Sequence, residues 1–472
     1  MSVPPSLWQV EQPWQGFPPL EGEAAADVVV IGAGVTGCAC ALRLAQGGAS
    51  VLVVEADRVA SGASGRNGGF ASAGTGLGLR DAAAQIGMPQ ALALHRATEA
   101  ALDEMLALAA ARGEADSVRR TGSLWLATSG EADHMAAAMT ALAGVGVDCR
   151  AAPELIPAPM RARYPRATVF PGDCELQPAR WVRALAGAAA AAGARLCERS
   201  PVTAVERLGD GWSVATPGGA ATAQAVVVAC DGLLARLVPE LHGVVYPVRG
   251  QMLATEPLAD PVVTLPTHSD HGFVYARPTL DGRLAIGGCR SADLEAEYTD
   301  ETSPTPAVQA ALDRFVTERM GLTGARITHR WAGTMGFSAD LLPVVGEVPE
   351  RPGLHVAGGY SGVGNVQGFV CGGMLADLIL GRGHALAAAL SPDRFAVDGR
   401  MRPRVELESS AKAAACGNSC LSDRRNWSHH LHQNRIFRWD QWGGTMTACN
   451  HSSRHQALCA CSVARSSPAS PW

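Results

Sequence analysis

The chain has 472 residues, of which 47% are apolar, so it is long enough to bury one large or two medium hydrophobic cores. Its formal net charge of −5 gives no basic field for nucleic acid, and no apolar stretch reaches the roughly 20 residues that a membrane span requires. Residues 1–22 lack the basic and apolar segments of a signal peptide. We therefore expect a cytoplasmic protein with reduced cysteines and with neither nucleic acid nor membrane as partner.

The first predicted elements are a strand, a glycine turn and a helix. Val28 to Ile31 are β-branched, which is typical of a strand buried on both faces. Gly32, Gly34 and Gly37 then fill the pattern G-x-G-x-x-G: the first allows a tight turn, the second lets the backbone approach a pyrophosphate, and the third lets the helix pack on the strand. A helix from about Val35 to Leu44 directs its N-terminal N–H groups at the phosphates.

A second apolar strand, Ser50 to Val54, ends at Glu55, at the spacing where an acid accepts hydrogen bonds from the adenosine ribose. The acid argues against a 2′-phosphorylated cofactor. Strand, helix, strand and acid together predict dinucleotide binding. The residues that we expect at this end of the cofactor are Gly32, Ala33, Gly34, Val35, Thr36, Gly37, Glu55 and Ala56.

A second glycine cluster covers residues 61–69. A nicotinamide enzyme has no evident need for it, whereas FAD continues past the pyrophosphate with a ribityl chain and a ring that backbone must approach. Ser64, Arg66 and Asn67 would add donors to phosphate or flavin oxygens. The alternative is a mobile glycine loop without a ligand. The predicted cofactor contacts here are Gly62, Ala63, Ser64, Arg66, Asn67, Gly68 and Gly69.

The middle of the chain predicts helices and then a change to short strands. Helical spacing covers residues 89–112 and 131–143, a strand-like alternation lies between them at 122–128, and an alanine-rich helix covers 184–194. Predicted strands at 202–205, 212–215 and 225–229 resume the dinucleotide domain, and Val202 is a further predicted cofactor contact. Short strands with turn residues between 244 and 288 predict the antiparallel sheet of a second domain.

A last glycine loop repeats the logic of the first, because the apolar strand 354–357 leads through glycines into a helix that continues to Leu380. The predicted cofactor contacts in this loop are Gly359, Tyr360, Ser361, Gly362, Val363 and Gly364.

The tail from 398 to 472 has no apolar periodicity, and we expect it to be disordered. Cys416, Cys420, His430 and His432 miss the usual zinc spacings, so no metal is predicted.

Together these motifs resemble the FAD-dependent D-amino-acid oxidase superfamily. The shared features are the two glycine loops with Glu55, Arg249-Gly-Gln251, Tyr275-Ala-Arg-Pro, Trp331-Ala-Gly and Gly359-Tyr-Ser-Gly. Within the superfamily, Ser6-Leu-Trp8 and residues 64–69 are most similar to gamma-glutamylputrescine oxidases. The resemblance implies an α/β fold: a Rossmann-type, glutathione-reductase-like FAD domain and a discontinuous antiparallel-sheet substrate domain of α+β type.

The resemblance divides the chain into alternating segments. These are an N-terminal arm at 1–24, FAD-binding segments at 25–88, 151–241 and 333–397, substrate-domain helices at 89–150, the substrate-domain sheet at 242–332, and the tail at 398–472.

Four departures from the superfamily bear on the chemistry. Met335 stands where amino-acid oxidases carry a carboxylate-binding arginine, which favours an amine without an α-carboxylate. Ala285 stands where sarcosine-oxidase relatives carry an oxygen-activating lysine, so oxygen or another electron acceptor remains open. Gly333 and Arg66 replace residues that attach the flavin in some relatives, so we expect non-covalent FAD. Val363 replaces a common histidine.

The resemblance implies oxidation of the C–N bond of an amine by hydride transfer to the flavin, giving an imine that hydrolyses to an aldehyde. Tyr275, Trp331 and Tyr360 would wall the site, although each aromatic serves equally well as core packing. Arg277 would meet a distal carboxylate or be structural. With Met335, these are the predicted catalytic residues. His268 and His271 are further possible bases, with solvated loop histidines as the alternative. The alternatives for function are a glycine, sarcosine or D-amino-acid oxidase or dehydrogenase, a non-catalytic flavin scaffold, and an NAD-dependent dehydrogenase.

Overall fold

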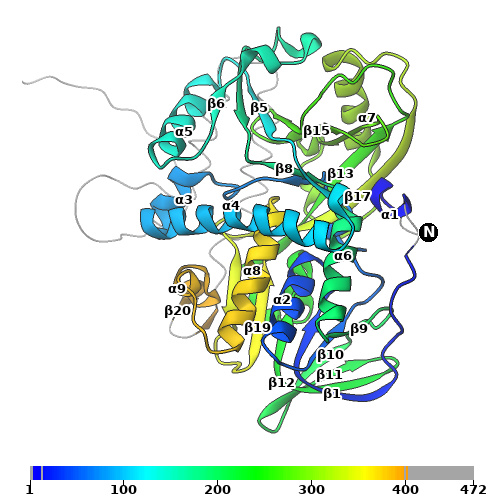
Figure 1. Cartoon of the computed structure of the whole chain (residues 1–472), viewed down its shortest axis with the longest axis vertical. Helices are drawn as coiled ribbons and strands as arrows, with labels where there is room; N and C mark the ends of the chain where they lie inside the picture. Colours follow the sequence, from blue (N-terminus) through cyan, green and yellow to red (C-terminus); the bar gives the residue numbers. More distant parts are fainter. Residues whose placement is uncertain (1–3, 12–13, 398–399, 402–472) are drawn as a thin grey trace, which may run out of the picture.

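Two large sheets organise the computed structural model, which describes residues 4–11, 14–397 and 400–401 (Figure 1). The first sheet runs β9-β2-β1-β12-β19 in parallel, with β18 antiparallel beside β19 and the hairpin β10–β11 on the early half of β12. Its strands are β1 (Gly22–Ile31), β2 (Val51–Val54), β9 (Arg195–Cys197), β10 (Ala204–Leu208), β11 (Gly211–Thr216), β12 (Gly219–Val228), β18 (Val344–Glu347) and β19 (Leu354–Gly358).

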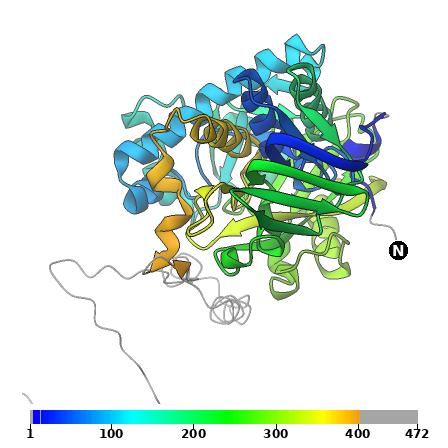
Figure 2. The same ribbon diagram turned by 90° about the horizontal axis from the view of Figure 1, so that it is seen from below.

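Both faces of β1 are covered, as its run of β-branched residues predicts. Val28 and Val30 pack on one side with residues of the helices, whereas Val29 and Ile31 pack on the other side with Trp212 of the hairpin. Turned by 90°, the molecule shows helices on one face of this sheet and the green hairpin strands at the other (Figure 2). A strand enclosed in this way holds its carboxyl end, where the glycine turn begins, in a fixed place.

The second sheet is mostly antiparallel and has the order β17-β13-β16-β15-β14-β5-β7-β6. Its strands are β5 (Ser123–Ala127), β6 (Arg150–Ala151), β7 (Arg166–Phe170), β13 (Val245–Thr255), β14 (Thr267–Ser269), β15 (Val274–Pro278), β16 (Leu284–Gly288) and β17 (Ile327–Ser338). A small third sheet joins β3 (Phe70–Ala71), β8 (Cys174–Leu176) and β4 (Val118–Arg120), and β20 (Ala396–Val397) pairs with β21 (Arg400–Met401).

The long helix α4 crosses between the two sheets in Figure 1, while α2, α6 and α8 stand against the first sheet. The helices are α1 (Leu7–Val10), α2 (Val35–Gln46), α3 (Leu79–Ile86), α4 (Met88–Ala111), α5 (Ala132–Gly144), α6 (Pro178–Ala191), α7 (Pro306–Arg314), α8 (Gly364–Ile379) and α9 (Ala387–Leu390). Within the described part of the chain, no helix is both long and apolar enough to cross a membrane.

The N-terminal arm carries a short capped helix that packs on the core. Ser6 and Gln9 form a reciprocal capping box at α1, which satisfies two backbone N–H groups at the helix start. Trp8 is buried and stacks edge-on against Trp331 at 6.1 Å between ring centroids. The part of the arm around Trp8 therefore belongs to the buried interior of the protein.

The predicted α/β fold with a separate antiparallel sheet is confirmed. The strands differ from the expected segment boundaries in two places. β7 pairs with β5 in the second sheet, although residues 151–241 were expected in the FAD domain, and β17 crosses the expected boundary at 333. Strand pairing between distant segments sets these boundaries, and local pattern does not reveal it. The predictions for the tail, including its disorder and the zinc ligands considered there, fall outside the described residues.

Candidate active site

A cavity of about 370 Å³ is lined by residues of the second sheet and of all three glycine-rich segments. We call it the flavin cavity. The predicted cofactor residues that line it are Gly34, Val35, Thr36, Ala63, Ser64, Arg66, Asn67, Gly68, Tyr360, Ser361, Gly362, Val363 and Gly364. Those outside its lining are Gly32, Ala33, Gly37, Glu55, Ala56, Gly62, Gly69, Val202 and Gly359.

The first glycine turn has the geometry that its sequence predicts. Gly32 has a φ of +104°, in the region that favours glycine. A Cβ on Gly37 would lie 1.9 Å from the carbonyl oxygen of Gly32, and a Cβ on Gly34 would lie 2.9 Å from Ser64 Oγ. Helix α2 begins without a side-chain cap at Gly34. The turn thus brings backbone and a helix N-terminus to the cavity wall, where a phosphate is favoured.

Glu55 lies directly behind this turn. Its carboxylate accepts hydrogen bonds from the N–H of Ala33 at 2.7 Å and of Asp57 at 3.0 Å. Burial raises the pKa of Glu55. The side chain therefore braces the glycine turn and places an acceptor at the end of β2, as an adenosine ribose requires.

The loop 63–69 is tied to the last glycine loop by two asparagines. Asn67 and Asn365 exchange side-chain hydrogen bonds of 3.0 and 3.1 Å, and Asn365 Nδ2 also donates to the carbonyl of Phe70. These bonds join segments that are almost 300 positions apart in the sequence. The two loops therefore form one wall of the flavin cavity.

Arg66 differs from the role that its sequence position suggests. Its guanidinium donates to the carbonyls of Pro4 and Ala332, at 2.6 Å each, and to Gln9 Oε1 at 3.0 Å. These protein acceptors engage each of its three nitrogens, so the placement argues against a phosphate as its main partner. Arg66 instead fixes the loop between the N-terminal arm and β17.

Three predicted catalytic residues, Tyr275, Met335 and Tyr360, line the flavin cavity. Met335 Cε would be 3.0 Å from a Cβ on Gly250, so its thioether side chain fills the space beside β13. Tyr360 is 4% exposed, and its hydroxyl lies 2.8 Å from Thr36 Oγ1. The bond joins the last glycine loop to the first turn of α2.

Removing that bond should loosen the two loops. We expect Tyr360→Phe to lower the free energy of unfolding by about 1 kcal/mol, because the buried Thr36 hydroxyl loses its partner. Urea unfolding of the FAD-loaded protein measures the change. Tyr246→Phe is the control, since no hydrogen bond of the Tyr246 hydroxyl is found in the described residues. Equal losses in the two variants would contradict the role of the bond.

Trp331 and Arg277 do not line the flavin cavity. The Trp331 indole N–H donates to the carbonyl of Arg66 at 2.8 Å, and its ring packs on Trp8. The Arg277 guanidinium lies over the Trp8 ring, 4.9 Å from its centroid. Their positions argue for roles in packing rather than in contact with a substrate.

Sequence reasoning missed Arg290, which is part of the cavity wall. It follows the glycine pair at the end of β16, and its guanidinium lies 5.1 Å from the ring centroid of Phe273 and 4.9 Å from that of Phe337. Within the described chain, no carboxylate forms an ion pair with it within 4.0 Å. The cavity therefore contains an arginine that is near Glu297 electrostatically but, among the described residues, has no carboxylate within ion-pair distance. An arginine two residues after the pair Gly287-Gly288 was the available signal.

Sequence reasoning also missed Asp231. It is half-buried, and its carboxylate accepts from the N–H of Gly336 at 2.7 Å and of Gly359 at 2.9 Å. Burial raises its pKa. The side chain joins β17 to the loop after β19 and so fixes two sides of the cavity.

His268 lines the cavity, and both of its ring nitrogens are buried without a hydrogen-bond partner in the described part of the chain. It stacks on Trp125 at 4.3 Å and lies 4.5 Å from Phe70. Burial lowers the pKa of His268 to about 3, so the ring is neutral near pH 7. A neutral imidazole with free nitrogens is suited to hydrogen-bond an amine. His271 also lines the cavity, beside Glu131.

The low pKa of His268 predicts a pH dependence of stability. Between its folded pKa of about 3 and an unfolded pKa of about 6.5, the unfolded chain binds more protons, so stability falls as the pH falls through this window. From about pH 7 to about pH 5 the unfolding free energy should drop by about 2 kcal/mol more in the native protein than in His268→Phe. The exposed His134, changed to Gln, is the control. Urea unfolding at both values makes the comparison, and parallel losses in all three proteins would contradict it.

The residues fit a dinucleotide with a flavin. The uncapped start of α2 and the backbone of Gly34 line one end of the cavity, and the joined loops at Asn67 and Asn365 line its side. A Cβ on Gly34 would lie 2.9 Å from Ser64 Oγ, so a side chain at this position would crowd the cavity wall. Among the described residues, no group of three metal-ligating side chains is placed to hold an ion.

The family model for FAD-dependent oxidoreductases called DAO matches residues 27–378. The chain belongs to this family. The probable oxidoreductase OrdL of Rhizobium meliloti is 31% identical over 376 residues, which cover 78% of this chain and 86% of OrdL. The glycine oxidase of Geobacillus kaustophilus is 28% identical over 375 residues, covering 75% of this chain and 92% of the oxidase. Its crystal structure aligns with a TM-score of 0.65 over 78% of this chain and 98% of that one.

Membership in the DAO family gives FAD as the cofactor, as predicted, and makes the chain an FAD-dependent oxidoreductase. The readings as a scaffold or as an NAD-dependent dehydrogenase are thereby set aside. The L-proline dehydrogenase of P. horikoshii, 22% identical with a TM-score of 0.65 and coverage of 81% and 100%, shows the same fold.

Proposed function

We propose that this DAO-family protein oxidises the C–N bond of an amine whose carboxylate lies away from the reacting carbon, with gamma-glutamylputrescine-like amines as the preferred class. The observation that carries this proposal is Met335, which places a thioether in the cavity wall where the family's amino-acid oxidases carry an arginine. An α-carboxylate beside it would be buried without a cation, which costs several kcal/mol. The similarity to OrdL, a probable oxidoreductase, supports the reaction type without naming a substrate.

The remainder of the cavity suits an extended amine. Trp125, Phe70 and Tyr275 form a continuous aromatic wall with His268, and this wall favours the neutral amine by removing water from the cation. Arg290 offers its guanidinium to a carboxylate at another part of the wall. The chain thus provides separate surfaces for the two ends of such a substrate.

Bound FAD would accept the hydride from the carbon next to nitrogen, and hydrolysis of the resulting imine would release an aldehyde. We infer that FAD is held without a covalent bond. A Cβ on Gly333 would lie 2.9 Å from Arg66 Cβ, and neither residue offers an attachment group. The electron acceptor is oxygen or another oxidant. Ala285 is fully buried and supplies no cation to assist oxygen.

The same cavity supports a second candidate, a glycine, sarcosine or D-amino-acid oxidase. Its specific support is Arg290, which places a cation in the cavity wall although position 335 carries no arginine. The similarity to glycine oxidase is a second support. The two candidates differ in where the carboxylate lies relative to the reacting nitrogen.

Anaerobic reduction of the bound flavin separates the candidates. The FAD-loaded protein is mixed under nitrogen with gamma-glutamylputrescine, putrescine, glycine, sarcosine and D-alanine, and flavin absorbance is followed. We expect rapid bleaching by gamma-glutamylputrescine and slow bleaching by putrescine, which lacks the carboxylate. Bleaching by glycine or sarcosine alone would reject the first proposal in favour of the second.

A further inference from the structure

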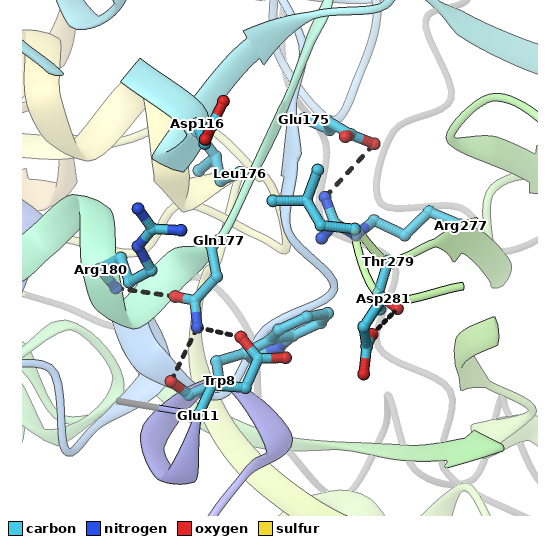
Figure 3. A pocket seen from close by; sticks show the side chains of 11 residues that line it. Trp8, Glu11, Asp116, Glu175, Leu176, Gln177, Arg180, Arg277, Thr279 and Asp281 are labelled. Carbon is cyan, nitrogen blue, oxygen red and sulfur yellow. Dashed lines mark hydrogen bonds and ion pairs between the residues drawn. The ribbon is translucent and has the colours of Figure 1, made fainter. Parts of the chain in front are cut away.

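A second cavity, of about 190 Å³, shares no lining residue with the flavin cavity. It lies among the end of α1, β8, the start of α6 and the turn after β15 (Figure 3). The residues that line it include Trp8, Glu11, Glu175, Gln177, Arg277 and Asp281. We call it the arm pocket, because Trp8 and Glu11 belong to the N-terminal arm.

One side of the arm pocket is cationic. Arg277 is 3% exposed, and its Nε–H has no hydrogen-bond acceptor among the residues that the structure describes. Its Nη1 lies 3.5 Å from Glu175 Oε2, but Glu175 also accepts from Arg119 Nε at 3.0 Å and from Arg119 Nη2. Two guanidinium groups thus share one carboxylate. Arg277 is left with charge and donors that the protein does not satisfy, and burial lowers its pKa.

Another side is anionic. Glu11 accepts a hydrogen bond of 2.6 Å from Gln177 Nε2, but across the described residues it forms no ion pair within 4.0 Å. Partial burial raises the pKa of Glu11, the hydrogen bond from Gln177 lowers it, Asp281 raises it, and the charges of Arg277 and Arg180 lower it. In Figure 3 the carboxylate of Glu11 lies beside Trp8 and Gln177, whereas Arg277 reaches toward Glu175.

Arg277 and Glu11 therefore line one pocket without pairing with each other. Arg277 is buried whereas Glu11 lies at the exposed mouth of the pocket, and such separated charges gain from a ligand that brings the opposite charge to each. At about 30 Å³ per water, the pocket has room for roughly six waters, or for one small organic molecule. A simple anion would satisfy Arg277 but would face Glu11 and Asp281.

We propose that the arm pocket is a binding site for a small zwitterion, an α-amino acid, whose carboxylate meets Arg277 and whose ammonium meets Glu11. The site is separate from the one where the amine is oxidised. It lies behind the loop 63–69, because Trp8 donates to the carbonyl of Asn67 at 2.7 Å and Arg277 donates to that of Gly69 at 3.3 Å. The ligand therefore does not compete with the amine substrate. This inference does not depend on the identity of that substrate.

Calorimetric titration of the FAD-loaded protein tests the site, with L-alanine as the probe under nitrogen and with acetate and methylammonium as its two halves. We expect saturable binding of one alanine per chain that leaves the flavin oxidised, and at least about tenfold weaker binding of each half. Glu11→Gln keeps the contact with Gln177 but removes the charge, and it should weaken alanine about tenfold. Glu21→Gln, at an exposed position of the same arm, is the matched control and should bind as the native protein does.

Three results would overturn the proposal. These are absence of saturable alanine binding to the native protein, binding of acetate as tight as that of alanine, and displacement of alanine by an amine that bleaches the flavin. The probe comparison uses the unchanged protein, so it remains decisive if a variant fails to fold. Unchanged alanine binding by a folded Glu11→Gln would also reject the assigned ammonium contact. Failure of the proposed amine oxidation would appear separately, as a flavin that no amine bleaches.

Discussion

Gly37→Ala should yield a protein that retains less than about a tenth of its FAD. The added Cβ would lie 1.9 Å from the carbonyl oxygen of Gly32 and 3.3 Å from Val30 Cγ1, so α2 must move away from β1. Overpacking of this kind costs about 1–3 kcal/mol, and here it also displaces the helix N-terminus from the phosphates. The ratio of flavin to protein absorbance after purification measures the effect.

Gly373→Ala is the matched control on α8. No atom lies within 4 Å of a Cβ at this position, and its φ is ordinary. Alanine replaces glycine inside a helix there, so we expect full FAD content and up to about 1 kcal/mol of added stability. Full flavin content in Gly37→Ala would show that close contact between α2 and β1 is not needed for the cofactor.

Arg290→Met should lower kcat/KM for a carboxylate-bearing amine by about 10- to 100-fold. A hydrogen bond to a charged group contributes about 1.5–3 kcal/mol, and each 1.4 kcal/mol corresponds to about tenfold. Methionine keeps an apolar side chain between Phe273 and Phe337. Anaerobic flavin reduction over a range of amine concentrations measures the loss, and it should appear mainly in the apparent affinity.

The selectivity of the loss is the main check on Arg290. An amine without a carboxylate, such as putrescine, should be oxidised almost equally by the variant and the native protein. Arg351→Met removes an arginine that also lies over an aromatic ring, that of Trp212, but outside the flavin cavity, and it should leave both amines unaffected. If Arg290→Met slowed both amines equally, the residue would be supporting the cavity and not binding a carboxylate.

The glycine motifs could be predicted because their chemistry is local. A positive φ at Gly32 and the contact between Gly37 and Gly32 depend on residues only a few positions apart. The strand–turn–helix pattern around them carries the same information. The predicted FAD fold therefore followed from short stretches of sequence.

The substrate wall could not be predicted in the same way, because sheet order decides it. Trp125 and His268 meet because β5 pairs with β14, and nothing near either residue announces that pairing. Arg66 shows the converse error. Its glycine-rich surroundings suggested a phosphate contact, yet the arm supplies acceptors from Pro4 and Gln9. Local sequence likewise does not tell which arginine reaches the cavity. Arg290 lines it, whereas Arg277 does not.

The contacts that join the arm and the loop 63–69 to β17 determine when the cavity wall can form during synthesis. Arg66 binds the carbonyls of both Pro4 and Ala332, and Trp8 packs on Trp331. A growing chain can form neither the Arg66–Ala332 bond nor the Trp8–Trp331 contact until β17 has been made, although the first glycine turn emerges some 300 residues earlier. The cavity wall that would bind the flavin is therefore complete only late in synthesis. Until then Trp8 of the arm lacks the contact with Trp331 that covers it in the folded protein.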